Sequence, residues 1–175
     1  MSLNQSFIAE LRMEAANTRK MLERVPVEKN DWKPHQKSMK LGRLATHVAE
    51  LPTWISTTMT TDELDLSNMD YKSVMAATND ELTAKHDANI AKAIETLENA
   101  TPDDFNKMWT LRNGEQVIFS MPKKVVLRSI AFNHMIHHRG QLSVFLRLLD
   151  IPVPGMYGPS ADEMPAPAEL EASAN

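Results

Sequence analysis

Four stretches of this chain repeat apolar residues at the spacing of an α-helix, and this periodicity constrains the fold more than any other feature. Apolar side chains that recur every three or four residues line one face of a helix, and that face has to be buried. The expected helices cover about residues 4–24, 38–59, 78–100 and 120–149. Four amphipathic helices predict an all-α fold in which these faces pack together.

Capping residues and a proline mark the ends of these helices. Ser38, Thr78 and Ser120 are each expected to cap the helix that follows, and Glu81 completes a capping-box pattern with Thr78. Pro52 falls inside the second periodic stretch, where we expect a kink or a local break because proline cannot donate a backbone hydrogen bond.

The segments between the helices carry two further signals. Residues 108–119 alternate in polarity around Asn113-Gly114, which predicts a short β-hairpin with a type I′ turn, packed on the outside of the helices. The stretch from about Thr60 to Ala77 is polar and not periodic, so it predicts a long connection that lets the second and third helices run parallel.

The length of the chain limits the number of domains. A chain of 175 residues with 42% hydrophobic residues suffices for one domain with its own core. We expect this domain to span residues 1–160. Residues 161–175 are expected to form an irregular tail, because prolines and glycines follow Asp150 and the end is rich in alanine and proline.

Composition excludes several classes of function. The net charge is −4 and the basic residues are scattered, which argues against a nucleic-acid partner. The chain has no cysteine, so it forms no disulfide and offers no thiolate to a metal, which fits a reducing compartment. No stretch approaches the roughly 18 apolar residues of a membrane span. We therefore expect a cytoplasmic protein without a membrane partner.

Three histidines form a candidate metal site. His134 and His138 are four residues apart on the last expected helix, so their side chains lie on one face, about 5–6 Å apart at Cβ. A third ligand has to come from another helix, and His47 lies in the middle of the second one. Three neutral imidazoles would leave an ion positively charged, with positions open to water or substrate.

Each of these histidines also has a structural interpretation. His47 and His134 can be core residues that bond to backbone carbonyls. His137 points to the flank of the helix face and is expected to be a surface group or a neighbour of the ligands. His35, in a loop, and His86, on a charged stretch, are expected to be solvated.

Nearby charged residues raise similar alternatives. Glu50 follows His47 by three residues and can accept a proton beside an ion, or it can be a solvated glutamate on the edge of the helix. Arg139 and Arg147 can bind a substrate carboxylate, but pairing with acidic residues of the chain is the favoured interpretation.

The segment LGRLATHVAEL, followed by NHMIHHRGQLSVFLRLLDIPVPGMYGPS, resembles the DinB family in its histidine pattern. A Trp-Lys-Pro segment before the second helix and the Tyr-Gly-Pro-Ser segment add to this resemblance, which covers the chain from the first helix through Ser160. The resemblance implies a right-handed, up-down-down-up four-helix bundle and a homodimer. It also implies that His47, His134 and His138 bind a divalent metal, zinc or nickel foremost, with iron and manganese as further candidates.

These features together predict a metalloenzyme that hydrolyses a small electrophile or transfers a thiol to it. The ion would act as a Lewis acid and lower the pKa of a bound water or thiol. A low-molecular-weight thiol would have to be a second substrate, and Glu50 or Tyr157 would handle protons. The alternatives are a stress-linked metal-binding or interaction protein without turnover, and a plain helical dimer with packed histidines.

Overall fold

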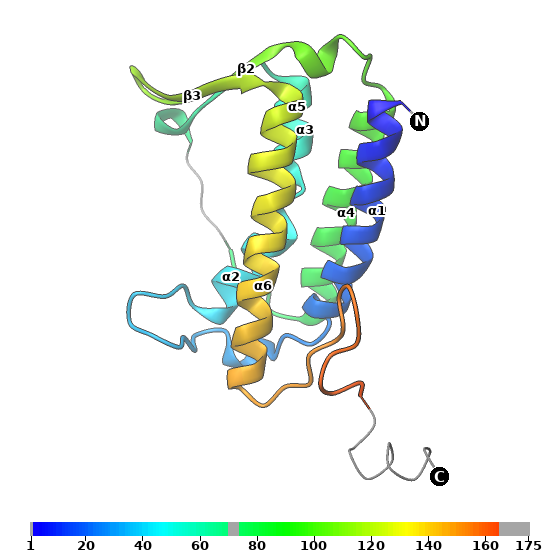
Figure 1. Ribbon diagram of the computed structural model, residues 1–175. Coiled ribbons are helices and arrows are strands. Elements are labelled where there is room, and N and C mark those ends of the chain that lie inside the picture. Colours follow the sequence, from blue (N-terminus) through cyan, green and yellow to red (C-terminus); the bar gives the residue numbers. More distant parts are fainter. Residues whose placement is uncertain (1, 70–73, 165–175) are drawn as a thin grey trace, which may run out of the picture.

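A computed structural model describes residues 2–69 and 74–164 of the chain. They form a mostly helical molecule with a small three-stranded sheet at one end (Figure 1). In chain order, the elements are α1 (Leu3–Leu22), α2 (Leu41–Glu50), α3 (Thr53–Thr60), β1 (Glu63–Asp65), α4 (Asn79–Glu98), β2 (Met108–Asn113), β3 (Gln116–Pro122), α5 (Lys123–Val126), a π-helical turn (Leu127–Phe132) and α6 (Asn133–Leu148).

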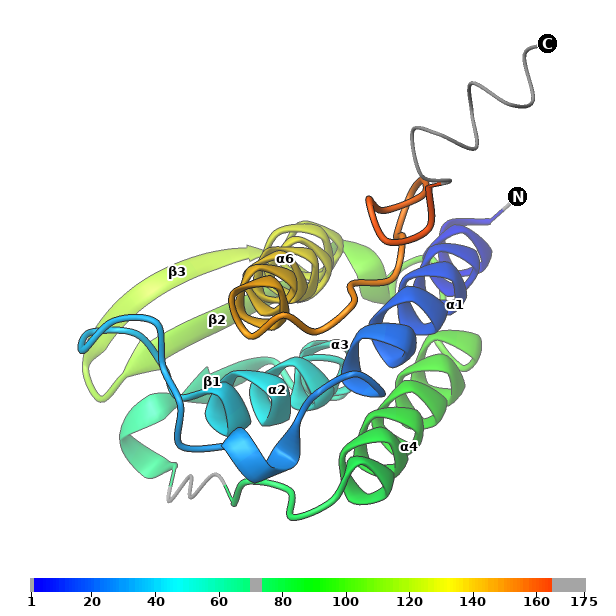
Figure 2. The ribbon, with the colours of Figure 1, turned by 90° about the horizontal axis from the view of Figure 1, so that it is seen from below.

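The long helices lie side by side around one core. α4 packs against α1, α2 and α3, and α6 packs against α1 and α2 (Figure 2). In Figure 1, α2, α3 and α4 run in one direction along the molecule, while α1 and α6 run in the other. A plain four-helix description is too simple for this chain, because Pro52 separates α2 from α3 and the π-helical turn separates α5 from α6.

Two apolar clusters fill the space between the helices. One gathers aromatic side chains from three elements: the ring of Phe7 lies 5.9 Å from that of Phe105 and 5.6 Å from that of Phe132, measured between centroids. The other holds α2 against α1 and α6 and contains the fully buried Leu44 and Leu146. Because α2 and α6 share this second cluster, their facing sides have a fixed separation.

Of the three predicted helix caps, one is present in the structure and two are not. The Thr78 hydroxyl accepts a hydrogen bond from the Glu81 backbone N–H at 3.1 Å, which confirms the predicted cap. The caps predicted at Ser38 and Ser120 are wrong. α2 begins at Leu41, and Ser120 lies in β3, where its hydroxyl is 3.0 Å from that of Thr110 on the neighbouring strand.

The hairpin predicted at residues 108–119 is confirmed and extends to Pro122, but its turn differs from the predicted one. Asn113 pairs with Gln116, so Gly114 and Glu115 form the two-residue loop. Gly114 has a φ of +60° and Glu115 has no positive φ. A positive φ at the first loop position alone is the pattern of a type II′ turn, and not of type I′.

The sheet also contains a strand that the sequence did not predict. β1 pairs in parallel with β2, so the strand order is β1-β2-β3. The hairpin does not simply cover the outside of the helices, because Trp109 on β2 is fully buried and packs near Trp54 of α3. The predicted all-α class is therefore corrected to mostly helical with a small sheet.

The segment after α6 folds back along the helices toward α1 (Figure 2). Arg147 donates two hydrogen bonds to the carboxylate of Asp162, at 3.0 and 2.6 Å, which holds this segment against α6. Residues 165–175 of the predicted tail lie outside the described residues, and the predicted boundary at residue 160 stays a prediction. In the described ranges, no helix has the combination of length and apolar character that crossing a bilayer requires.

Candidate metal centre

The fold brings together three histidines from two helices. His47 comes from α2, and His134 and His138 come from α6. One ring nitrogen from each lies within 4.8 Å of the other two, and the Nε2 atoms of His47 and His134 are 3.4 Å apart. We call His47, His134 and His138 the histidine group.

The spacing of these nitrogens fits a shared metal ion. Two nitrogens that each lie about 2.1 Å from an ion, at a tetrahedral angle, are about 3.4 Å from one another. The observed separation of the His47 and His134 Nε2 atoms, 3.4 Å, equals this value. It is longer than the range of about 2.7–3.2 Å that is usual for an N–H hydrogen bond, so a direct His–His bond explains the arrangement less well.

Hydrogen bonds from the second ring nitrogens orient two of the rings. The Nδ1 atom of His138 lies 2.7 Å from Oε1 of Gln141, and because an amide oxygen can only accept, this nitrogen donates. His134 donates to the backbone carbonyl of Ile130. Both contacts leave the other nitrogen of the ring with a lone pair, as a metal ligand requires.

Burial keeps the histidine group neutral. Burial is the largest cause, and together with the nearby His138, His134 and Arg43, when these are positively charged, it lowers the pKa of His47 to about 4. Burial is also the main cause that lowers the pKa values of His134 and His138. A positive charge on His138 lowers the pKa of His134 further, and a positive charge on His137 lowers that of His138 further. At neutral pH each ring is therefore neutral, with one N–H and one nitrogen that offers a lone pair.

A π-helical turn directly precedes the part of α6 that carries His134 and His138. It spans Leu127–Phe132 and contains Ile130, whose carbonyl accepts the hydrogen bond from His134. A π-helical turn adds a residue to a helix and changes the direction in which the following side chains point, which is why such turns concentrate at functional sites. Here the turn contributes to the orientation of His134 toward α2.

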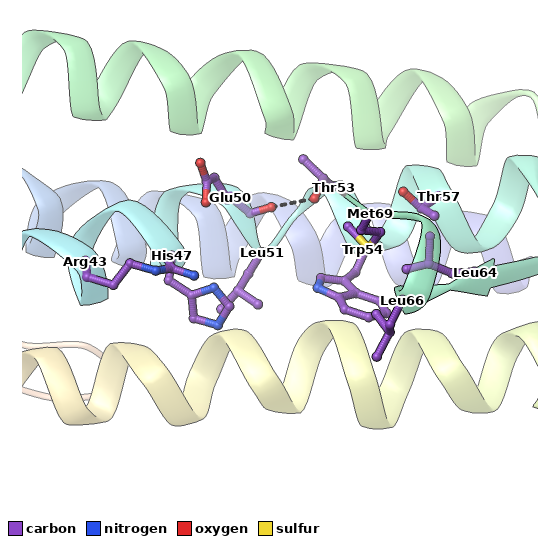
Figure 3. Close-up of a pocket in the computed structure, with 10 residues that line it drawn as sticks. All are labelled: Arg43, His47, Glu50, Leu51, Thr53, Trp54, Thr57, Leu64, Leu66 and Met69. Atoms are coloured by element: carbon purple, nitrogen blue, oxygen red, sulfur yellow. Dashed lines mark hydrogen bonds between the residues drawn. The ribbon is translucent and has the colours of Figure 1, made fainter. Parts of the chain in front are cut away.

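A cavity of about 390 Å³ opens beside His47. Figure 3 shows that Arg43, His47 and Glu50 lie at one end of it, whereas Trp54, Leu64, Leu66 and Met69 lie at the other. We call it the Glu50 cavity. The Lys85 ammonium on α4 donates to Oε1 of Glu50 at 3.1 Å, so this carboxylate is held beside the histidine group by an ion pair.

A second cavity, of about 520 Å³, lies on the side of α6. It is lined by His134 and His137 together with apolar side chains of α3, the sheet and the π-helical turn. We call it the His134 cavity. Trp54 and Leu66 line both cavities, and Leu64 lines the Glu50 cavity beside them. We call Trp54, Leu64 and Leu66 the apolar wall; it lies between two spaces that each reach the histidine group.

The other histidines have different environments. His137 is exposed and its ring centroid is 4.9 Å from that of His138, but it is not part of the group. His35 is exposed, as predicted. The prediction that His86 is solvated is wrong: its side chain is 1% exposed, because α4 turns this residue inward and leaves its charged neighbours at the surface.

Tyr157 lies in a different cluster from the histidine group. Its hydroxyl donates to the carboxylate of Glu14 at 2.9 Å and accepts from Arg139 at 2.6 Å. Neither cavity described above is lined by these three residues. Arg139 and Arg147 both pair with acidic residues of the chain, Glu14 and Asp162, which confirms the favoured interpretation for the two arginines.

Sequence reasoning missed the apolar wall of the site. Trp54 follows Pro52 on α3, and Leu64 and Leu66 flank Asp65 at the end of β1. A signal for this strand was present, since the segment Glu63-Leu64-Asp65-Leu66 alternates between polar and apolar residues. Four residues of alternation inside a polar stretch were too short to set it apart from a loop.

The fold and the histidine group thus define a helical protein with a nitrogen-lined site that can hold a metal ion. The sequence model of the DinB family matches residues 1–170, and the chain belongs to this family. The uncharacterized protein YrdA of Bacillus subtilis is 27% identical over 161 residues, which cover 90% of this chain and 89% of YrdA.

Solved structures of DinB-like proteins share the fold. One from Bacillus cereus superposes with a TM-score of 0.67 at 25% identity, covering 87% of this chain and 97% of the other. The DinB-like protein YjoA of Bacillus subtilis has the same TM-score at 16% identity, with coverage of 86% and 97%.

Proposed function

We propose that this protein is a metal-dependent enzyme in which His47, His134 and His138 bind one divalent ion beside a substrate cavity. The observation that carries the proposal is the convergence of three imidazole nitrogens within 4.8 Å of one another. Three nitrogen ligands fit zinc or nickel, and iron or manganese can be bound by the same set. When bound, such an ion supplies Lewis acidity and lowers the pKa of a coordinated water or thiol.

The remaining parts of the site are assigned to the chain's own residues. The Nδ1–H of His138 donates a hydrogen bond to Gln141, and His134 donates one to the backbone carbonyl of Ile130. These two hydrogen bonds keep each ring in one orientation. Glu50 lines the cavity beside His47 and is positioned by Lys85, where it can accept a proton from a nucleophile. We do not assign a proton-transfer role to Tyr157, because its hydroxyl is bonded to Glu14 and Arg139.

The reaction proposed for this site is hydrolysis of a small electrophile or transfer of a thiol to it. The chain contains no cysteine, so a thiol would come from a low-molecular-weight second substrate. A cavity of about 390 Å³ next to the histidine group supports a catalytic role over a purely structural one, because a stabilising ion needs no open space beside it.

Metal analysis tests the proposal directly. Protein purified without a nickel column is expected to contain about one divalent ion per chain, and His134→Ala is expected to lose it because three ligands become two. His137→Ala is the matched control: it removes a neighbouring imidazole outside the group and should keep the ion. Wild-type protein that stays free of metal in the presence of zinc, nickel, iron and manganese would contradict the proposal.

Turnover requires a second assay. Metal-reconstituted protein is tested with thiol co-substrates and with epoxide, halide and amide electrophiles. We expect Glu50→Gln to lower turnover at least tenfold while the metal content stays the same. Failure of the whole panel, with all measured functions intact in His138→Ala, would favour a metal-binding protein without catalysis.

A further inference from the structure

The wall between the two cavities is apolar, and packing against the sheet holds it in place. The Trp54 indole packs edge-on against Trp109, with ring centroids 6.2 Å apart and an interplanar angle of 70°. Trp109 is itself fully buried, and its Nε1–H donates to the Thr61 hydroxyl at 3.0 Å. The position of Trp54 is therefore set by the packing of the sheet on α3, and does not depend on a ligand.

Leu64 and Leu66 are fixed by the residue between them. The carboxylate of Asp65 accepts hydrogen bonds from the backbone N–H of Gly114 at 2.9 Å and from that of Ser67 at 3.0 Å. Leu64 is also in register with Leu111 of β2. The tip of the hairpin thus holds Leu64 at the Glu50 cavity and Leu66 at both cavities.

The wall leaves apolar surface exposed where a ligand can cover it. Leu66 is 38% exposed although it lines both cavities. The charged and imidazole groups of the Glu50 cavity, Arg43, His47 and Glu50, lie together at its other end (Figure 3). A ligand that fills this space therefore meets polar groups at one end and an indole and leucines at the other.

We infer that the substrate of this site carries an uncharged aromatic or branched aliphatic body, which lies on Trp54 and Leu66, and a single reactive polar end directed at the histidine group. This inference rests on the proposed function, because the histidine group defines which end reacts. A charge on the body of the substrate would lose its hydration against the indole and the leucines, and among the described residues that line this end none carries a compensating charge. Trp54, Leu64 and Leu66 are the residues that determine specificity.

Two fluorescent probes with the same ring system test the inference. N-phenyl-1-naphthylamine is uncharged, and 1-anilinonaphthalene-8-sulfonate adds one negative charge to the same rings. We expect the uncharged probe to bind the wild-type protein at one site per chain. The sulfonate can bind only with its charge at the polar end beside Arg43, so both probes should respond to a change in the wall. Absence of saturable binding of the uncharged probe overturns the inference.

A pair of matched variants locates the binding. Leu66→Asn is expected to weaken binding of N-phenyl-1-naphthylamine about tenfold, since it puts an amide on the apolar wall. Leu3→Asn makes the same change at a leucine of similar exposure, 43%, at the start of α1, and should leave binding unchanged. Equal affinity of the wild type and Leu66→Asn overturns the inference.

Metal content separates this inference from the proposed function. Leu66→Asn leaves all three histidines in place, so it should retain the same amount of ion as the wild type. Wild-type protein without metal overturns the proposed function, whereas the probe measurements still decide whether the wall selects an uncharged apolar body.

Discussion

Adjacent residues on α6 have separate roles, which the pair His138 and Arg139 illustrates. His138 faces α2 and belongs to the histidine group. The side chain of Arg139 is 2% exposed and pairs with the equally buried Glu14 of α1 at 2.6 Å. A desolvated ion pair is tolerated only when its remaining donors are satisfied, and Arg139 also donates to the Glu14 carbonyl and the Thr18 hydroxyl, both at 3.1 Å. One step along the helix thus separates a candidate ligand from a structural contact.

The burial of His86 on α4 leads us to expect that the protein loses stability in mild acid. Its side chain is 1% exposed, and burial lowers its pKa, with partial compensation by Asp87 and a further lowering by Arg19. Because the pKa is lower in the folded state than the value of about 6.5 in the unfolded state, the unfolded chain binds the proton more readily. The stabilising contribution of neutral His86 is therefore complete above about pH 6.5 and decreases as the pH falls below this value.

Urea unfolding of metal-free protein at about pH 7.5 and about pH 5.5 measures this effect. The three histidines of the histidine group also have lowered pKa values, so the wild type and every variant that keeps them should lose some stability in acid. His86→Gln removes one titrating group, and its loss between the two pH values should be smaller than that of the wild type by about 1 kcal/mol. Identical losses in the two proteins would rule out this account of His86.

At the scale of elements, local patterns identified the helices, but contacts distant in sequence decided the rest. The apolar periodicity predicted the regions of α1, α4 and α6, and Pro52 marked the break between α2 and α3. β1 has three residues and depends on pairing with β2, where Leu64 is opposite Leu111, so its own segment carries little signal. Ser120 has the chemistry of a helix cap, yet pairing with Thr110 places it in a strand.

Two helical glycines are predicted to respond to alanine with opposite signs. In an exposed helix, Gly→Ala increases stability by about 0.5–1 kcal/mol. Gly140 on α6 meets this case, because a Cβ there would find no atom within 4 Å. At Gly42 on α2, a Cβ would lie 2.6 Å from Cγ of Asn30, whose amide donates to the Ala76 carbonyl at 2.9 Å.

We therefore expect Gly140→Ala to stabilise the protein by about 0.5–1 kcal/mol and Gly42→Ala to destabilise it by about 1–3 kcal/mol. Equilibrium unfolding in urea measures both changes under one condition. If the two variants shift stability in the same direction, helix propensity and not the contact with Asn30 controls the response at Gly42.

At the scale of the whole molecule, the site is assembled from segments that are far apart in the chain. His47 and His134 are separated by 87 positions, and they meet because α2 and α6 share an apolar cluster. The spacing of His134 and His138 and the family resemblance were enough to predict the three histidines. The wall of Trp54, Leu64 and Leu66 could not be predicted, because it exists only after the sheet packs on α3 and the hairpin tip holds Asp65.

A metal ion bound by the histidine group would connect α2 to α6, so metal removal is expected to lower the stability of the whole molecule. A ligand that binds the folded state alone, at a free concentration about 100 times its Kd, adds about 2.7 kcal/mol to the free energy of unfolding. For a chain of this size, that corresponds to a rise of roughly 5–11 °C in Tm. Thermal unfolding with added zinc, and again with a chelator in excess, measures the difference.

His47→Ala provides the decisive comparison in this experiment, because His47 is the one member of the histidine group on α2. Without it, the remaining two ligands lie on α6 and an ion can no longer connect the helices, so zinc should produce little change in Tm. His137→Ala should respond to zinc as the wild type does, since its ring lies outside the group. A zinc-dependent rise in Tm that persists undiminished in His47→Ala would show that the ion binds elsewhere on the molecule.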